Sequence, residues 1–293
     1  MNSTKNSDSE GLESVISRAD GSELSSIKTI VSGIVEIINN PESTVRELKE
    51  IIETDPPLTA KVLKVSNSAY YGCRGHIGDI EQAVIWIGFD TLKEIALSQK
   101  VCELFEKEER IHGYSRPLLW RHSVCCALLG KYLYRAVFNE RGENAYAAGL
   151  LHDIGIIVED QLLHKQFEAV LQRCIDMGKN LQDAENELLG YNHAQVGFAL
   201  ADRWNFPDDL AHAIEEHHSP DRITSQYERL AISTYVCDYL CQSYSEGYSD
   251  APHTEDAFYS ESLKLLGLDR LSIERIVKKM QQELQLRAQR GWF

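Results

Sequence analysis

His152 and Asp153 stand side by side at the end of an apolar segment, Ala145 to Leu151, and form the most informative pair of side chains in the sequence. Neighbouring residues on a helix diverge by about 100°, yet both can reach one or two metal ions from the same turn. Imidazole and carboxylate groups are the donors that a borderline or hard divalent cation prefers. The pair therefore predicts metal chemistry.

Further imidazole and carboxylate groups lie on segments with helical apolar spacing, and helical bundles assemble metal centres from separate helices. A single His on such a segment is more often a hydrogen-bonded core residue than a ligand. Asp238 is harder to explain in that way, because a carboxylate buried among apolar neighbours costs several kcal/mol unless it is paired or bound to a cation. The candidate ligands are His122, His152, Asp153, His193, His217, His218 and Asp238.

If two ions bind, these side chains divide into two sets that share Asp153 as a bridge, and iron or manganese suits them better than magnesium. A structural metal site that joins the helices and sets a surface for a partner protein is the alternative. Arg121 and Lys165 are the nearest candidates in sequence for contacting a phosphate, although such side chains usually point into solvent. The first ion would take His122, His152, Asp153 and Asp238, and the second would take His193, His217 and His218.

The segments that must position these residues all favour helix. Pro (7) and Gly (18) are scarce and separate the periodic segments, and no period-two alternation is long enough to require a sheet. The pattern predicts an all-α fold of two packed helical subdomains. The predicted helices are 27–38, 45–55, 58–65, 80–87, 91–105, 118–137, 144–151, 165–177, 181–189, 193–204, 208–217, 227–244, 256–265 and 272–287.

The predicted organisation has four parts. Residues 1–22 are rich in Ser, Glu and Asp and are expected to be a mobile polar tail with a short helix at Leu12 to Ser17. Residues 23–112 are expected to be an N-terminal helical subdomain, residues 113–245 a second helical subdomain, and residues 246–293 a helical extension. The last helix carries apolar residues on one face that could form a homodimer as easily as pack on the protein's own core. These are Ile273, Ile276, Val277 and Met280.

Composition excludes several partners. The formal charge of −15 argues against direct binding of duplex DNA or an anionic membrane, which need a basic face. No run of about 18 apolar residues and no apolar leader is present, so a cytoplasmic location is expected. The seven cysteines are scattered without CxxC spacing, which favours reduced thiols over disulfides or a zinc site. Adjacent Cys125 and Cys126 are read as small core residues.

The order His122, His152-Asp153, Asp238 is similar to the H…HD…D pattern of the HD superfamily of metal-dependent phosphohydrolases. The additional histidines resemble the fuller ligand set of binuclear members, including the HD-GYP cyclic-dinucleotide phosphodiesterases. Three blocks in the first half are more specific and resemble the signature of the HDOD (HD-related output domain) family, over about Ser25 to Asp238. They are Asp55–Leu63 (DPPLTAKVL), Asn67–Gly72 (NSAYYG) and Ile80–Gly88 (IEQAVIWIG).

This resemblance implies a small N-terminal bundle packed against an HD-type bundle, in a bacterial signalling context with signalling proteins as partners. Many HDOD proteins have lost the metal ligands and act as regulatory modules, whereas this chain retains them. It also departs from the HD-GYP enzymes: Ile156 stands where they carry Lys, Ser219 where they carry Glu, and Pro220–Ile223 where Gly-Tyr-Pro is expected. A cationic side chain near the metals would help to hold a phosphate.

We therefore expect a regulatory protein with a metal-bound HD core that acts mainly through protein contacts. The alternative is a metal-dependent phosphohydrolase or phosphodiesterase acting on a nucleotide or cyclic nucleotide, with Asp153 as its catalytic metal bridge. In the Asn67–Gly72 block, Asn67 is expected to hydrogen-bond the end of a helix and Gly72 to adopt a positive φ, with Tyr70 and Tyr71 packed between the bundles. A ligand groove is the other interpretation of this block.

Overall fold

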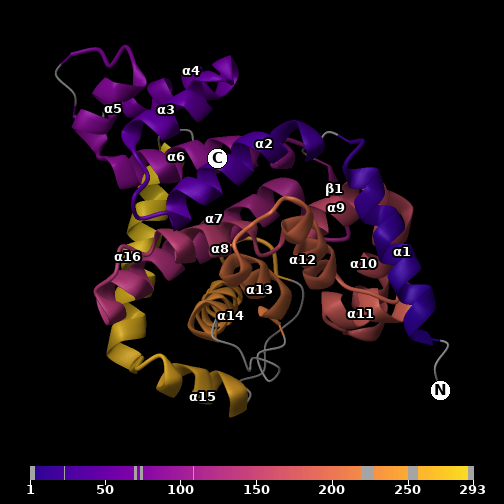
Figure 1. Cartoon of the computed structure of the whole chain (residues 1–293). Helices are drawn as coiled ribbons and strands as arrows, with labels where there is room; N and C mark the ends of the chain where they lie inside the picture. The colour runs from indigo at the N-terminus through magenta and orange to yellow at the C-terminus, as the bar shows by residue number, and fades with distance from the viewer. Residues whose placement is uncertain are drawn as a thin grey trace.

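In the computed structural model, residues 4–22, 24–68, 71–72, 75–107, 109–218, 228–249 and 257–289 are described, and they are almost entirely helical (Figure 1). The predicted all-α class is confirmed. Short turns of 3-10 and π-helix, η1 (Glu103–Phe105) and η2 (Tyr134–Phe138), follow α6 and α7. The helices are α1 (Thr4–Ala19), α2 (Leu24–Asn39), α3 (Val45–Glu53), α4 (Pro56–Ser66), α5 (Ile80–Ile87), α6 (Phe89–Cys102), α7 (Arg116–Leu133), α8 (Glu143–Leu151), α9 (Ile154–Leu162), α10 (His164–Met177), α11 (Leu181–Leu188), α12 (His193–Arg203), α13 (Asp208–Glu216), α14 (Glu228–Ser243), α15 (Ala257–Leu265) and α16 (Arg270–Gln289).

Capping side chains fix where several helices begin. Thr44 accepts a hydrogen bond from the backbone N–H of Glu47 at the start of α3, and the Glu47 side chain returns the contact, which forms a capping box. Asp55 caps α4, and Asn192 caps α12 through a second capping box. Each cap satisfies N–H groups that have no partner within the helix. The predicted starts at residues 45 and 193 are therefore confirmed, whereas α4 begins at Pro56, two residues before the predicted start at residue 58.

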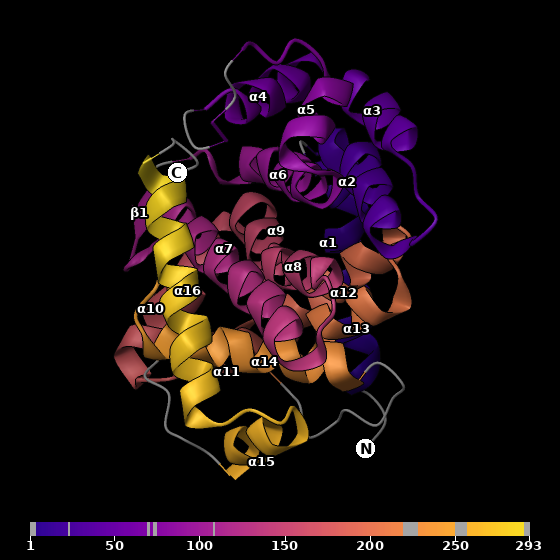
Figure 2. The same cartoon turned by 90° about the vertical axis from the view of Figure 1, so that its left-hand side faces the viewer.

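Helices α2–α6 form one group, which lies on one side of α7 and α8, while α13 and α14 lie on the other (Figure 1). Helix α16 runs along one side of the molecule from α15 towards the N-terminal group (Figure 2). Its Ile276, Val277 and Met280 are buried within the chain, so the face that the sequence offered for a homodimer packs on the protein's own core. Two short strands, β1 (Arg110–Ile111) and β2 (Tyr114–Ser115), pair antiparallel before α7.

Two helices differ from the sequence-based expectation. The expected mobile tail over residues 1–22 contains α1, which buries Val15, Ile16 and Ala19 and contacts α9 and α12. Its apolar residues are too few to indicate a stable helix alone, but the neighbouring helices supply the surface that orders it. Helix α9, which no predicted helix covered, starts directly after Asp153 and is buried over its first seven residues. A helix buried on all sides has no amphipathic pattern to reveal it.

Two glycines allow the helices that carry the candidate ligands to approach closely. A Cβ atom on Gly155 of α9 would lie 1.9 Å from the carbonyl oxygen of His193, and one on Gly149 of α8 would lie 2.5 Å from the backbone nitrogen of Ala127. Real Cβ atoms do not tolerate such contacts, so the packing of α9 on α12 and of α8 on α7 depends on these residues being glycine.

The Asn67 interpretation is confirmed where the structure describes it. The Asn67 side-chain amide donates to the carbonyls of Leu63 and Ile77 and accepts from the Ile77 N–H, and Gly72 has a φ of 63°. Tyr71 is partly buried, whereas Tyr70 lies outside the described residues. Within the described part of the chain, no helix has the length and apolar character needed to cross a membrane.

Candidate metal centre

The seven candidate ligands come from helix ends and helix interiors that meet in the second bundle. His122 lies in α7 and Asp238 in α14. His152 ends α8, and Asp153 immediately precedes α9. His193 is the first residue of α12, His217 ends α13, and His218 follows it. The break between α8 and α9 turns the adjacent His and Asp towards the same point, which a continuous helix would not do.

The structure brings all seven side chains together. The Nε2 atom of His122 lies 3.2 Å from Nε2 of His152 and 3.0 Å from Oδ1 of Asp238. Asp153 sits between two sets of imidazoles: its Oδ2 lies 3.2 Å from Nε2 of His152, and its Oδ1 lies 3.4 Å from Nε2 of His217 and 3.7 Å from Nε2 of His193. His218 closes the ring, 3.0 Å from His193 and 3.7 Å from Asp238.

The donor atoms form two groups, each with all atoms within 4.8 Å of one another. We call the first the Asp238 group, which comprises His122, Cys126, His152 and Asp238, and the second the Asp153 group, which comprises Asp153, His193, His217 and His218. Six of the seven predicted ligands are fully buried, and the His218 side chain is 15% exposed. Such burial of polar groups requires strong compensating partners.

Hydrogen bonds on the outer side of three imidazoles determine which nitrogen faces the centre. The Nδ1–H groups of His152 and His217 donate to the carbonyls of Gly149 (2.9 Å) and Ile214 (2.7 Å). The Nδ1–H of His193 donates to the Glu185 carboxylate at 2.7 Å. In each neutral imidazole the Nε2 lone pair therefore points inward. Metal-binding histidines typically donate their other ring N–H to a carbonyl or carboxylate in this way.

Lone pairs then face lone pairs. The buried Nε2 of His217 has no hydrogen-bond partner, and it points at a carboxylate oxygen of Asp153 that cannot donate. A cation between these atoms resolves the conflict, and the mixed imidazole and carboxylate donor set is that of a borderline divalent ion. The residues of the site thus fit one or two divalent metal ions.

The electrostatics agree with this interpretation. Burial alone would raise the pKa of Asp153, but its contacts with the surrounding imidazoles, His152 first and then His217, hold it well below its usual range. Burial likewise opposes the ionisation of Asp238, yet its hydrogen bond with His122 lowers the pKa of Asp238. Burial lowers the pKa of His217 and His218, so both imidazoles stay neutral, as ligands must.

Two residues at the centre, Cys126 and Glu185, are missing from the predicted set. The Cys126 thiol lies 3.5 Å from Nε2 of His122, and its position four residues later on the same helix face was a usable signal. Glu185, which orients His193, lies on a different helix and gave no local signal. Arg121 and Lys165 do not reach the centre: Arg121 is ion-paired with Glu246 at 2.6 Å, and Lys165 is exposed on α10.

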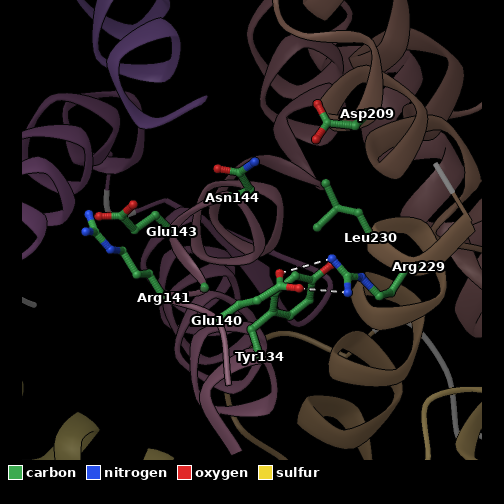
Figure 3. A pocket seen from close by; sticks show the side chains of 9 residues that line it. Tyr134, Glu140, Arg141, Glu143, Asn144, Asp209, Arg229 and Leu230 are labelled. Atoms are coloured by element: carbon green, nitrogen blue, oxygen red, sulfur yellow. Dashed lines mark hydrogen bonds and ion pairs between the residues drawn. The ribbon is translucent and has the colours of Figure 1, made fainter. Parts of the chain in front are cut away.

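A polar cavity of about 390 Å³ lies at the opposite ends of the same helices. It is lined by residues at the starts of α8, α13 and α14, whereas the ligands of these helices lie towards their C-termini. In Figure 3 the Arg229 guanidinium meets the Glu140 carboxylate through two contacts of 2.9 and 3.0 Å beside the Tyr134 ring. None of the seven ligands lines this cavity, so it is separate from the candidate metal centre.

The model of the HDOD domain matches residues 24–220 of this sequence. The chain belongs to the HDOD family. This match covers α2–α13 and includes every candidate ligand except Asp238.

Known relatives share the fold. An HDOD domain protein of unknown function from Geobacter sulfurreducens superposes with a TM-score of 0.75 at 25% identity, covering 90% of this chain and 92% of its own. A proposed signal transduction protein from Marinobacter aquaeolei VT8 gives 0.78 at 21% identity, covering 98% of this chain and 66% of its own. A Treponema pallidum protein of unassigned function is 26% identical over 80% of this chain. The chain spans about half of that relative's length, 46%.

Proposed function

We propose that this protein is a bacterial signal-transduction module whose metal-bound HD core holds the second bundle together and sets a surface for contacts with partner proteins. The burial of the ligands is the observation that carries this proposal. Structural metal sites are closed by protein ligands, whereas catalytic sites keep a position open for water or substrate. Here only His218 is partly exposed, at 15% of its side chain.

The surroundings of the centre support the same function. Neither Arg121 nor Lys165 points at it, so these two candidates supply no positive charge for a phosphate. An exposed apolar pair on α5, Ile85 (80% exposed) and Trp86 (53% exposed), offers a surface of the kind used in protein contacts. A signalling role, which the name of the Marinobacter relative gives for that protein, fits this arrangement, and we propose cytoplasmic signalling proteins as the partners.

Asp153 favours a second candidate, a metal-dependent phosphohydrolase or phosphodiesterase acting on a nucleotide. Its two carboxylate oxygens face different sets of imidazoles, Oδ2 towards His152 and Oδ1 towards His217, as a bridge between two ions requires. A two-metal site would acidify a water and stabilise charge on phosphoryl oxygens. In this reaction Asp153 would hold both ions in register, and His218 would lie at the exposed side of the centre.

One experiment separates the two candidates. Purified protein loaded with manganese or iron is assayed against a nitrophenyl phosphodiester, beside Asp153→Asn protein whose fold is checked by circular dichroism. The regulatory function predicts equal, background turnover for both proteins, together with metal-dependent thermal stability of the wild type. Turnover that Asp153→Asn abolishes while the fold is retained would contradict this function and support the enzyme.

A further inference from the structure

The Asp238 group contains a sulfur atom that the predicted ligand set lacks. Cys126 is fully buried on α7, one turn after His122 and on the same face of the helix. Its thiol contacts Nε2 of His122 at 3.5 Å, the same nitrogen that faces His152 and Asp238. The sulfur thus faces the space enclosed by three other buried donors.

We propose that Cys126 is a metal ligand, and that its sulfur makes the Asp238 group selective for a thiophilic divalent cation such as zinc(II) or iron(II). Thiolate is a soft donor that favours these ions over manganese and magnesium. The Asp153 group offers three imidazoles and one carboxylate without sulfur, so the two halves of the centre differ in preference. This inference rests on the metal-bound core proposed above.

The distances from His122 to the other three donors are close to those around a tetrahedral ion. Zinc bonds of about 2.0–2.1 Å to nitrogen and about 2.3 Å to sulfur place two nitrogens about 3.3 Å apart and nitrogen and sulfur about 3.6 Å apart. The observed separations are 3.2 Å between His122 and His152 and 3.5 Å between His122 and Cys126. The oxygen of Asp238 lies 3.0 Å from His122, slightly closer than such a tetrahedron requires.

Cys126 is distinguished from the other buried thiols by its position. Three further buried cysteines lie on the same two helices, Cys125 on α7 and Cys237 and Cys241 on α14. Among the described residues, none of them belongs to either donor group. The Cys125 thiol is hydrogen-bonded to Cys241, which also contacts the Cys126 thiol. These neighbours therefore provide controls of the same chemistry, burial and location.

Cobalt(II) tests the proposal without any activity assay, because a thiolate bound to cobalt gives an intense charge-transfer band in the near ultraviolet that imidazole and carboxylate do not give. The full-length protein is stripped of metal and titrated with cobalt. We expect the band in the wild type, in Cys125→Ser and in Cys241→Ser, and its loss in Cys126→Ser. We also expect cobalt affinity to fall about tenfold or more in Cys126→Ser, with a smaller change for manganese.

The outcomes are distinguishable. Cobalt bound without the charge-transfer band in the wild type would overturn the role of Cys126 while leaving the metal-bound core intact. Persistence of the band in Cys126→Ser, with loss in Cys241→Ser, would also overturn it. Protein that binds no cobalt at all would overturn the core and this inference together. Because the wild-type spectrum is informative alone, misfolding of a variant does not remove the test.

Discussion

The candidate metal centre and the contact between the two helical groups are both buried polar clusters, but they are built in opposite ways. Between the groups, Lys131 of α7 meets Glu94 of α6 at 2.6 Å, and Lys93 meets Glu143 at 2.7 Å. Arg287 of α16 approaches Glu94 at 3.7 Å and donates to Tyr146 at 2.8 Å. In this inter-bundle network, every cation has a carboxylate within the protein.

At the metal centre, acceptors face acceptors. His217 and Asp153 point a lone pair and a carboxylate oxygen at each other, and no Lys or Arg side chain of the described residues makes an ion pair with Asp153 or Asp238. His122 supplies part of the compensation: burial opposes its protonation, but the hydrogen bond and charge of Asp238 raise the pKa of His122 to about 9. The comparison teaches that a buried polar cluster indicates a bound ion when its charges do not balance internally.

Asp153→Asn is expected to have the largest effect, because this carboxylate faces both donor groups. We expect near-complete loss of bound metal, measured by elemental analysis after purification with divalent ions. Asp160→Asn is the control, since Asp160 lies on α9, the helix that follows Asp153, but pairs with Arg116 at 2.6 Å. Equal metal content in Asp153→Asn and wild type would contradict the assignment of the centre.

Glu94→Gln should break the inter-bundle network and leave the metal in place. Removing the charge of Glu94 leaves Lys131 and Arg287 without their shared carboxylate, and breaking a buried pair costs about 3–5 kcal/mol. Urea denaturation measures the loss. The exposed pair of Glu50 with Arg46 gives the control, because Glu50→Gln should change stability by less than about 1 kcal/mol. Equal, small effects of both variants would show that the network adds little.

A chelator should destabilise the protein through the metal centre and leave the inter-bundle network intact. A metal that binds only the folded protein adds about 2.7 kcal/mol of stability at a hundredfold excess over its dissociation constant. We therefore expect a chelator to lower the melting temperature of the wild type and of Glu94→Gln alike, and to leave Asp153→Asn unchanged. A chelator effect on Asp153→Asn as large as that on the wild type would place the stabilising ion elsewhere.

Glu159→Gln should change stability least, and the size of this change should depend on pH. Burial, and then the charge of Glu185, raise the pKa of Glu159 well above its usual value, and neither of its oxygens has a hydrogen-bond partner. The protonated carboxyl favours the fold below the unfolded-state pKa of about 4.3, and this contribution is lost as the pH rises through the higher folded-state value. Above neutral pH, Gln should stabilise the protein by about 1 kcal/mol.

Urea denaturation across the pH range checks this expectation. The wild type should lose more stability than Glu159→Gln as the pH rises from about 5 to about 8. Glu168→Gln, at an exposed position on α10, is the control and should follow the wild type. Parallel pH profiles for Glu159→Gln and wild type would show that the carboxyl carries no proton in this range.

The sequence by itself determined the local features of this protein. The helix starts after Thr44 and Asn192, the positive φ of Gly72 and the hydrogen bond of Asn67 to the end of α4 all act within a few residues, so residue type and spacing were sufficient to predict them. The ligand types and the family blocks were readable for the same reason. Helix α9 was missed, and α1 was predicted only over Leu12 to Ser17, because packing, not periodicity, stabilises them.

Which side chains meet depends on the tertiary structure. His122 and His152 are 30 residues apart, and His193 and His218 are 25 apart, so their contacts depend on how closely the helices pack at Gly149 and Gly155. The same packing buries Cys126 among the ligands and leaves Arg121 paired with Glu246. Distances of this kind arise from the summed burial of whole helix faces, which no local pattern of residues contains.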